Sequence, residues 1–269
     1  MKTLQKPQFP ALTPIVYGLS SLGLSLCLGM PALAETSSLL ENAPSSYLNM
    51  EMIVGSYIPP EESRVGGSST GGGPRTPDCP EMIALAPAFN HIGQTPSTRP
   101  TLVWYMAFGS QFPLQVSVSR IQPGSSASEP GEVVFTDLIE QSHAGFNAYT
   151  VLDSQMALEP GASYRWRVSC YPDEELKQEM RWIEAEMDVV APPAVIEDVA
   201  SLNDPVAQAE AYAAAGFWFD AIARVYKGDT PAAQALRTTL IQDLAELDRI
   251  PNNQVSIVRS DRLQQIIAQ

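Results

Sequence analysis

Three acidic residues at alternate positions, Glu184, Glu186 and Asp188, have a spacing that suits carboxylate chemistry. Alternate residues of a β-strand point to the same face and lie about 6.5–7 Å apart. A glycoside hydrolase uses two carboxylates at such a separation, and calcium sites also use carboxylate oxygens. However, a hydrolase pair normally lies in a cleft, and calcium takes about six to eight oxygens, more than one strand face supplies. The spacing alone therefore assigns no reaction and no metal.

Two arginines and a tryptophan are expected to lie on the same face as these acids. Arg165 and Arg167 alternate with apolar residues in one candidate strand, and Trp182 shares the parity of the acids in the next. If the two strands are antiparallel neighbours, two guanidinium groups face three carboxylates on one solvated surface, which explains the charges without catalysis. Trp182 is either an exposed ring for sugars or partner proteins, or a ring packed under a helical cap or an arginine. The possible binding surface comprises Arg165, Arg167, Trp182, Glu184, Glu186 and Asp188.

Other motifs for nucleophilic, metal or phosphate chemistry are incomplete. The two histidines, His91 and His143, lie in polar, turn-like stretches, and no Gly-x-Ser-x-Gly nucleophile elbow accompanies them. The glycine-rich stretch 66–73 is followed by Pro74 rather than by the Lys-Ser or Lys-Thr of a phosphate-binding loop, so it is predicted to be a tether. We therefore expect no catalytic residue, no bound metal and no cofactor.

The first 34 residues have the features of a cleavable signal peptide. Lys2 and Lys6 form a positively charged start, an apolar stretch follows over residues 15–28, and a small-x-small pattern ends at Ala34. About 14 apolar residues are short for a bilayer crossing, which needs about 20, so a retained anchor is disfavoured. We expect cleavage between Ala34 and Glu35. The mature protein would then be periplasmic or secreted, with no membrane span after processing.

The cysteines predict one disulfide in the mature chain. Cys27 is removed with the signal, and it follows Leu26, which is too large for lipoprotein processing. An even pair, Cys79 and Cys170, remains, and such a pair in an oxidising compartment most simply forms a bridge. Closing this loop is worth roughly 4–5 kcal/mol at most in the chain-entropy model. The alternatives are two free thiols or a metal pair, and a metal pair needs more ligands than two histidines readily give.

The composition limits the class of partner. Acidic residues outnumber lysines and arginines by 30 to 16, so the formal net charge is −14. This balance argues against nucleic acid and against anionic lipid headgroups as primary partners. The expected partner is an unknown envelope protein or a glycan. The length of 269 residues predicts one or two domains.

Four segments follow from changes in pattern along the chain: a signal peptide (1–34), a flexible linker (35–78), a β-sandwich (79–192) and a helical cap (193–269). The linker is rich in Ser, Pro, Gly and Glu, although residues 47–58 are apolar enough for an edge strand. Short apolar or alternating runs separated by turn residues predict the strands. These runs are residues 101–106, 114–118, 133–135, 149–152, 164–170 and 182–189.

Capping residues place the helices of the last segment. Asp204 and Thr230 each precede a proline, the usual sequence of an N-cap and a first helical residue. These caps predict helices that end near residues 214 and 248. A further helix is expected over residues 217–226, between Gly216 and Gly228, and a short one over residues 261–268.

Two short segments resemble known structural units. Residues 158–164 are similar to the tyrosine corner of fibronectin type III-like sandwiches, in which the tyrosine, here Tyr164, bonds to the backbone a few residues upstream. Residues 212–226 are similar to one tetratricopeptide unit, although a solenoid needs about three repeats. The predicted fold is therefore β plus α: an immunoglobulin- or fibronectin III-like β-sandwich followed by a small tetratricopeptide-like helical segment.

The chain as a whole resembles the cyanobacterial domain-of-unknown-function family 928. The matching stretches are Gly71 to Gly73 with Arg75, Cys79-Pro80, residues 85–87, Thr95, residues 100–105, residues 158–170 and residues 212–221. Members look like exported proteins without an assigned activity, so the resemblance implies a compartment and a fold but no catalytic residue. Here Pro74 follows the glycines and residues 76–78 are Thr-Pro-Asp, which departs from the family pattern and puts a role of the glycine loop in doubt.

Two hypotheses of function follow. The first is a non-enzymatic, exported cell-envelope or secreted binding protein, because a predicted sandwich without a complete catalytic set is joined to a repeat-like helical pair. The alternative is a hydrolase that acts on cell-wall or extracellular glycan with Glu184, Glu186 or Asp188.

Overall fold

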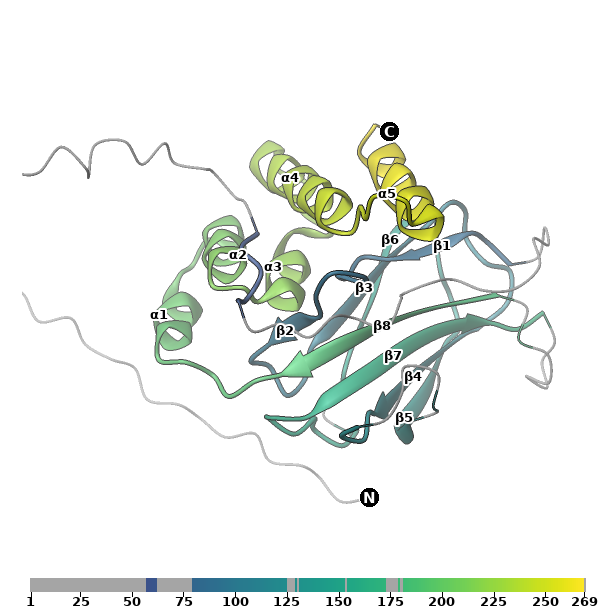
Figure 1. Ribbon diagram of the computed structural model, residues 1–269, viewed down its shortest axis with the longest axis horizontal. Coiled ribbons are helices and arrows are strands. Elements are labelled where there is room, and N and C mark those ends of the chain that lie inside the picture. Colours follow the sequence, from purple (N-terminus) through teal and green to yellow (C-terminus); the bar gives the residue numbers. More distant parts are fainter. Residues whose placement is uncertain are drawn as a thin grey trace, which may run out of the picture. The chain divides into compact units, whose positions relative to one another are not determined.

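The computed structural model describes residues 57–61, 79–124, 129, 131–152, 154–172, 179 and 181–268. The predicted signal peptide, its cleavage site at Ala34 and Glu35, and all of the predicted linker except residues 57–61 lie outside this part of the chain. Within it, eight strands are followed by five helices (Figure 1). The predicted order, β first and α second, is confirmed.

The strands form two open sheets, and neither closes into a barrel within the described residues. The smaller sheet has the order β1 (Met82–Ala84), β3 (Thr101–Met106) and β6 (Gly145–Thr150). The larger sheet has the order β2 (Gly93–Thr95), β8 (Arg181–Val189), β7 (Ser163–Cys170), β4 (Leu114–Arg120) and β5 (Glu132–Ile139). All neighbouring strands are antiparallel except β2 and β8, which are parallel.

Alternating burial explains the strands of the larger sheet. In β4, Leu114, Val116 and Val118 are buried, whereas the residues between them are half-exposed. In β7, Trp166 and Val168 are fully buried on the same side. These side chains join buried residues of the smaller sheet and of the helices in one hydrophobic core. The period of two in the sequence thus marks one face toward this core and leaves the other face polar.

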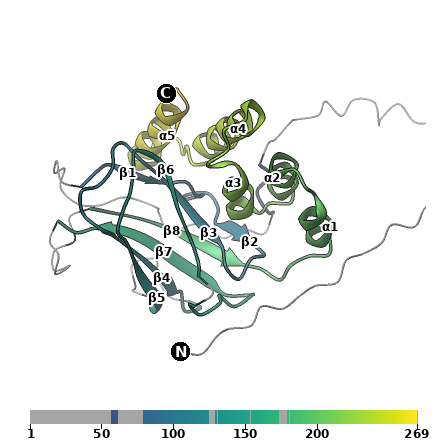
Figure 2. The ribbon, with the colours of Figure 1, turned by 180° about the vertical axis from the view of Figure 1, so that it is seen from behind.

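The helices lie over the smaller sheet, as two opposite views show (Figure 1, Figure 2). They are α1 (Val195–Ser201), α2 (Pro205–Ala214), α3 (Trp218–Val225), α4 (Pro231–Leu247) and α5 (Gln254–Ile267). Helix α3 contacts β2 and β3. Consequently Val103 of β3 is as fully buried as its neighbours Leu102 and Trp104, which point to the other face.

The predicted caps begin α2 and α4. The Asp204 carboxylate accepts a hydrogen bond from the Val206 N–H at 3.1 Å, and the Thr230 hydroxyl accepts one from the Ala233 N–H at 3.2 Å. Each cap satisfies a backbone donor that has no partner inside the helix. The prediction of α5 was too short, because Asn253 caps it eight residues before the predicted start at 261. Helix α1 was not predicted.

The structure contains the disulfide between Cys79 and Cys170. Cys79 precedes β1 of the smaller sheet, and Cys170 ends β7 of the larger one. The bridge therefore joins the two sheets. The predicted tyrosine contact is also present, since the Glu159 N–H donates to the Tyr164 hydroxyl at 2.8 Å.

Tyr57, in the middle of the predicted linker, is buried against the helices with only 5% of its surface exposed. Its N–H donates to Asp243 of α4 at 2.8 Å, and its ring meets Trp218 edge-on at 5.0 Å between centroids. The Ile58 N–H donates to the Ala213 carbonyl at 3.1 Å. Gly216, between α2 and α3, permits this docking because a side chain there would press against the Ile58 carbonyl and Pro60.

Helices long and apolar enough to cross a membrane do not occur among the described residues.

Candidate functional site

Antiparallel pairing of β7 and β8 brings the predicted charged residues together. Arg165 lies opposite Glu186, and Arg167 lies opposite Glu184. Arg165 Nη2 donates to Glu186 Oε1 at 3.0 Å. Arg167 donates from Nη2 and Nε to the same oxygen, Glu184 Oε2, at 2.8 and 3.1 Å. Each guanidinium group thus neutralises a carboxylate on the neighbouring strand, as strand parity predicted.

The two pairs differ in exposure, which corrects the expectation of one solvated surface. The side chains of Arg165 and Glu186 are only 13% and 7% exposed, whereas Arg167 is 37% exposed. Arg165 Nη1 also donates to the Glu129 carbonyl at 3.2 Å. The Arg165 pair is therefore part of the packed structure, and the Arg167 pair faces outward.

Glu179, just before β8, is a third acid of this cluster that the sequence did not single out. Its carboxylate lies 3.3 Å from Arg167 Nη1 and accepts a hydrogen bond from the Ser169 hydroxyl. Glu179 lies outside any strand, so strand parity gave no signal for it. Arg167 is consequently held between two carboxylates, one from β8 and one from the segment before it.

Trp182 lies on the same face but is not a bare aromatic surface. The Arg167 guanidinium carbon lies 4.3 Å from the centroid of the Trp182 ring. This is the cation–π arrangement that the sequence left open as an alternative. It covers one side of the ring.

Asp188 stands apart from the other predicted residues. It pairs with Ser163 at the far end of the strands, where the Ser163 hydroxyl donates to Asp188 Oδ1 at 2.6 Å. Among the described residues, no cluster of three or more His, Cys, Asp or Glu side chains is arranged to hold a metal ion. All six predicted surface residues thus lie on one face of β7 and β8, and Asp188, at one end of it, is bonded to Ser163 rather than to an arginine in the contacts described above.

A shallow polar groove runs across the outward face of β4, β7 and β8 and has a volume of about 280 Å³. Strand β4 supplies small polar side chains, which the sequence showed only as the solvated half of an alternating strand. Tyr171, directly after β7, was also not predicted to take part. The lining residues are Gln115, Ser117, Ser119, Gly131, Val133, Arg165, Arg167, Ser169, Tyr171, Glu179 and Glu184.

Neither histidine lies in this groove. His91 is buried and stacks on Tyr57 at 5.7 Å between ring centroids, and burial lowers its pKa while the nearby Asp248 carboxylate acts in the opposite direction. His143 is exposed, and its Nε2 lies 3.1 Å from the Phe146 carbonyl. His91 is thus packed in the interior, although its sequence context is polar and turn-like, and His143 faces solvent.

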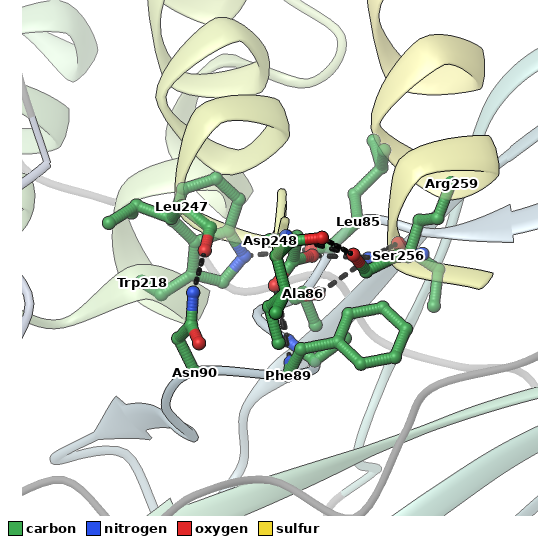
Figure 3. A network of polar contacts seen from close by, with 12 residues as sticks. Leu85, Ala86, Phe89, Asn90, Trp218, Leu247, Asp248, Ser256 and Arg259 are labelled. Atoms are coloured by element: carbon green, nitrogen blue, oxygen red, sulfur yellow. Dashed lines mark hydrogen bonds and ion pairs between the residues drawn. The ribbon is translucent and has the colours of Figure 1, made fainter. Parts of the chain in front are cut away.

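Another ion pair, Arg259 with Asp248, lies between the helices and the segment that connects β1 with β2 (Figure 3). Arg259 Nε donates to Asp248 Oδ2 at 3.0 Å. Arg259 Nη2 donates to the Ala84 and Ala86 carbonyls at 2.9 and 2.7 Å. The other carboxylate oxygen accepts bonds from the Ala88 and Phe89 N–H groups at 2.9 and 3.3 Å. We call Arg259, Asp248 and these backbone groups the helix clamp.

Trp218 of α3 and Asn90 extend the helix clamp (Figure 3). Trp218 Nε1 donates to the Leu85 carbonyl at 2.7 Å, and Asn90 Nδ2 donates to the Leu247 carbonyl at 2.5 Å. The backbone between β1 and β2 is thereby bonded to the helices at several successive residues. The helix clamp is a structural contact, because the groups of its charged pair are occupied by other protein groups.

Comparisons with known proteins give the family. A search of the curated proteins and a search of the solved structures found no match. A family model matches residues 66–254, which include every described strand, α1 to α4 and the first residue of α5. The chain therefore belongs to the family described as Domain of Unknown Function (DUF928).

Proposed function

We propose that the protein is an exported, non-enzymatic binding protein of the cell envelope or the medium, and that its ligand lies in the groove on the larger sheet. One observation supports this most. The groove is lined by polar side chains of three strands, and each of its charged residues is held in an ion pair within the protein. Such a surface is prepared for recognition of a ligand, because its geometry is fixed by contacts within the protein.

Export is supported by two independent features. The first 34 residues have the charged start, apolar stretch and small-residue end of a signal peptide. The bridge between Cys79 and Cys170 is a bond that persists mainly in oxidising compartments. Mass spectrometry of the exported protein tests both, since the chain should start at Glu35 and should gain two hydrogens on reduction. A full-length chain with free thiols would contradict export.

We also propose that the two sheets form an immunoglobulin- or fibronectin III-like sandwich capped by a tetratricopeptide-like helical pair. The bond between Glu159 and Tyr164 supports the first part, because this contact is typical of such sandwiches. The hairpin of α2 and α3 supports the second. An experimental structure tests both assignments through the order of strands and the angle between the two helices.

The hydrolase hypothesis is less well supported by the contacts of the acids. A glycosidase needs two carboxyl groups that both reach the scissile bond. Glu184 and Glu186 are each bonded to an arginine of the neighbouring strand, Arg167 and Arg165, and the Glu186 side chain is only 7% exposed. Binding without turnover is therefore the better proposal.

The experiment compares two tryptophan variants of the exported protein in a capture assay with envelope material from the source cells. Ser117→Trp fills the groove, since Ser117 lines it at the centre of the larger sheet. Ala235→Trp is the matched control on the exposed surface of α4. We expect capture to fall about tenfold, or about 1.4 kcal/mol, with the first variant and to stay unchanged with the second. Equal capture by both variants would contradict the proposed site. If the protein turns over a glycan and Glu184→Ala abolishes that turnover, the hydrolase hypothesis is favoured instead.

A further inference from the structure

We propose that the ligand of this groove is a neutral glycan chain. The inference rests on the proposed function, because it names the ligand class of the same groove. The charge of the lining, its hydrogen-bonding groups, its aromatic wall and its size all support it.

The charged residues of the lining are paired within the protein. Arg165 and Arg167 contribute two positive charges, and Glu179 and Glu184 contribute two negative ones. Arg167 is bound by both of these acids, and Arg165 is bound by Glu186, which does not line the groove. With Glu186 counted, the cluster carries one net negative charge, which disfavours an anionic ligand, and a cationic ligand would have to compete with two arginines. A neutral ligand leaves every ion pair intact.

Groups that form hydrogen bonds are nevertheless abundant. The Ser117 and Ser119 hydroxyls, two residues apart on the outward face of β4, have no protein partner among the residues that the structure describes. Each can donate one hydrogen bond and accept two. Glu184 binds Arg167 through one carboxylate oxygen, so in the described structure its second oxygen remains available to accept. A ligand covered with hydroxyl groups, each both a donor and an acceptor, matches this set.

Tyr171 gives the groove an aromatic wall. Its ring is half-exposed, and its hydroxyl donates to Gln115 Oε1 across the groove at 3.4 Å. An aromatic ring offers a flat apolar surface beside a polar edge. The C–H face of a sugar ring can pack on the flat surface while its hydroxyls reach the serines. Tyr171 thus adds an aromatic ring to the polar lining of the groove, and Trp182, which the sequence singled out, is not part of that lining.

The size and polarity of the groove separate a glycan from a protein partner. Its volume of about 280 Å³ is near the lower end of small-molecule sites, which span about 300–1,000 Å³. The core of a protein interface is more apolar and poor in charged residues. A shallow polar groove instead suits one unit of a chain whose other units continue along the sheet.

Calorimetric titration of the exported protein with defined saccharides tests the inference. The probes are neutral cello-, xylo-, malto- and chito-oligosaccharides, with polygalacturonate as a polyanion. We expect at least one neutral probe to bind, with little dependence on salt. Affinity should fall about tenfold or more, at least about 1.4 kcal/mol, in Tyr171→Ala and Ser117→Trp and stay unchanged in Ala235→Trp. Tyr171→Phe, which keeps the ring, should retain most of the affinity.

Other outcomes would overturn the glycan ligand. No binding of any neutral probe would do so, and so would binding of polygalacturonate alone with an affinity that falls as salt rises. Capture from envelope material treated with periodate or with a protease separates failure of the glycan ligand from failure of the proposed function. Periodate destroys vicinal diols, and a protease destroys proteins. If capture depends on Ser117 but survives periodate and is lost after protease, the groove binds a protein. If capture does not depend on Ser117, the proposed site itself is wrong.

Discussion

The helix clamp and the groove use the same chemistry, an arginine paired with a carboxylate, in opposite surroundings. In the helix clamp, Asp248 is fully buried, and backbone groups satisfy both the acid and Arg259. In the groove, Arg167 is 37% exposed, and its partners are other side chains. A buried pair bonded to the backbone fixes the fold, and it becomes costly when one partner is lost. An exposed pair adds little stability and remains accessible to a ligand.

The Arg165 pair lies between these extremes. It is on the same strands as the Arg167 pair but is nearly as buried as the helix clamp. Replacement of each arginine by methionine keeps most of the apolar stem and removes the charge, so three matched variants measure how burial changes the value of one interaction. The comparison predicts that the loss of stability increases with the burial of the pair.

Arg259→Met should have the largest effect, a loss of about 3–5 kcal/mol in the free energy of unfolding, because it removes the positive charge that balances the fully buried Asp248 carboxylate. Urea denaturation measures this loss. The double variant Arg259→Met/Asp248→Asn should recover part of it, since no unpaired charge remains. A loss below about 1 kcal/mol in the single variant would show that the helix clamp is not the main tie between helices and sheet.

Arg165→Met should have an intermediate effect of about 2–3 kcal/mol, the range for hydrogen bonds to charged groups that become unsatisfied on burial. Glu186, which is only 7% exposed, would lose its arginine partner. The same urea experiment checks the value. A loss equal to that of Arg167→Met would mean that depth in the sheet does not distinguish the two pairs.

Asp220 shows what a buried acid does without a direct arginine partner. It lies on α3, its Oδ2 is buried with no hydrogen-bond partner among the described residues, and burial raises its pKa to about 6. The hydrogen bond from Thr95 and the charge of Arg224 act in the opposite direction. The folded state binds the Asp220 proton more tightly than the unfolded state does. Protonation of Asp220 therefore stabilises the fold fully below about pH 4, and this stabilisation is lost as the pH rises through about 6.

Asp220→Asn should remove this pH dependence, since the amide does not titrate. From pH 4 to pH 7 the wild type should lose about 1–3 kcal/mol in the free energy of unfolding relative to the variant. Thermal or urea unfolding at several pH values measures it. His91 titrates in both proteins, with a lowered pKa that costs stability as the pH falls, so its effect cancels in the difference. A constant difference across this range would contradict the assignment.

Arg167→Met should have the smallest effect on stability, within about 1 kcal/mol, because the pair is partly exposed to water. Its effect on ligand affinity should be larger, since the variant disturbs both Glu184 and the Trp182 ring. Unfolding and titration on the same sample separate the two. A large loss of stability together with unchanged affinity would reverse the comparison between groove and helix clamp.

Strand parity predicted the relation of β7 to β8 well. Alternation placed Arg165 and Arg167 opposite the acids, and caps at Asp204 and Thr230 located two helix starts. These signals are local, because they depend on residues two to four positions apart. The run at residues 149–152 was misplaced, since β6 spans Gly145–Thr150 and Leu152 is exposed.

The helix clamp could not be predicted for a physical reason. Arg259 bonds to the carbonyls of Ala84 and Ala86, and a backbone carbonyl has no sequence signature. Strands β1 and β2 have three residues each, too few to show a period of two. The groove was only half predicted, because nothing local distinguishes Ser117 from any other solvated strand residue.

Cys170 is the last residue of β7, and the aromatic wall of the groove, Tyr171, follows it directly. The bond to Cys79 therefore anchors the backbone at this end of the groove to the other sheet. A reduced chain would lack this anchor. We therefore expect the ligand proposed for the groove to bind with full affinity only where cysteine is oxidised.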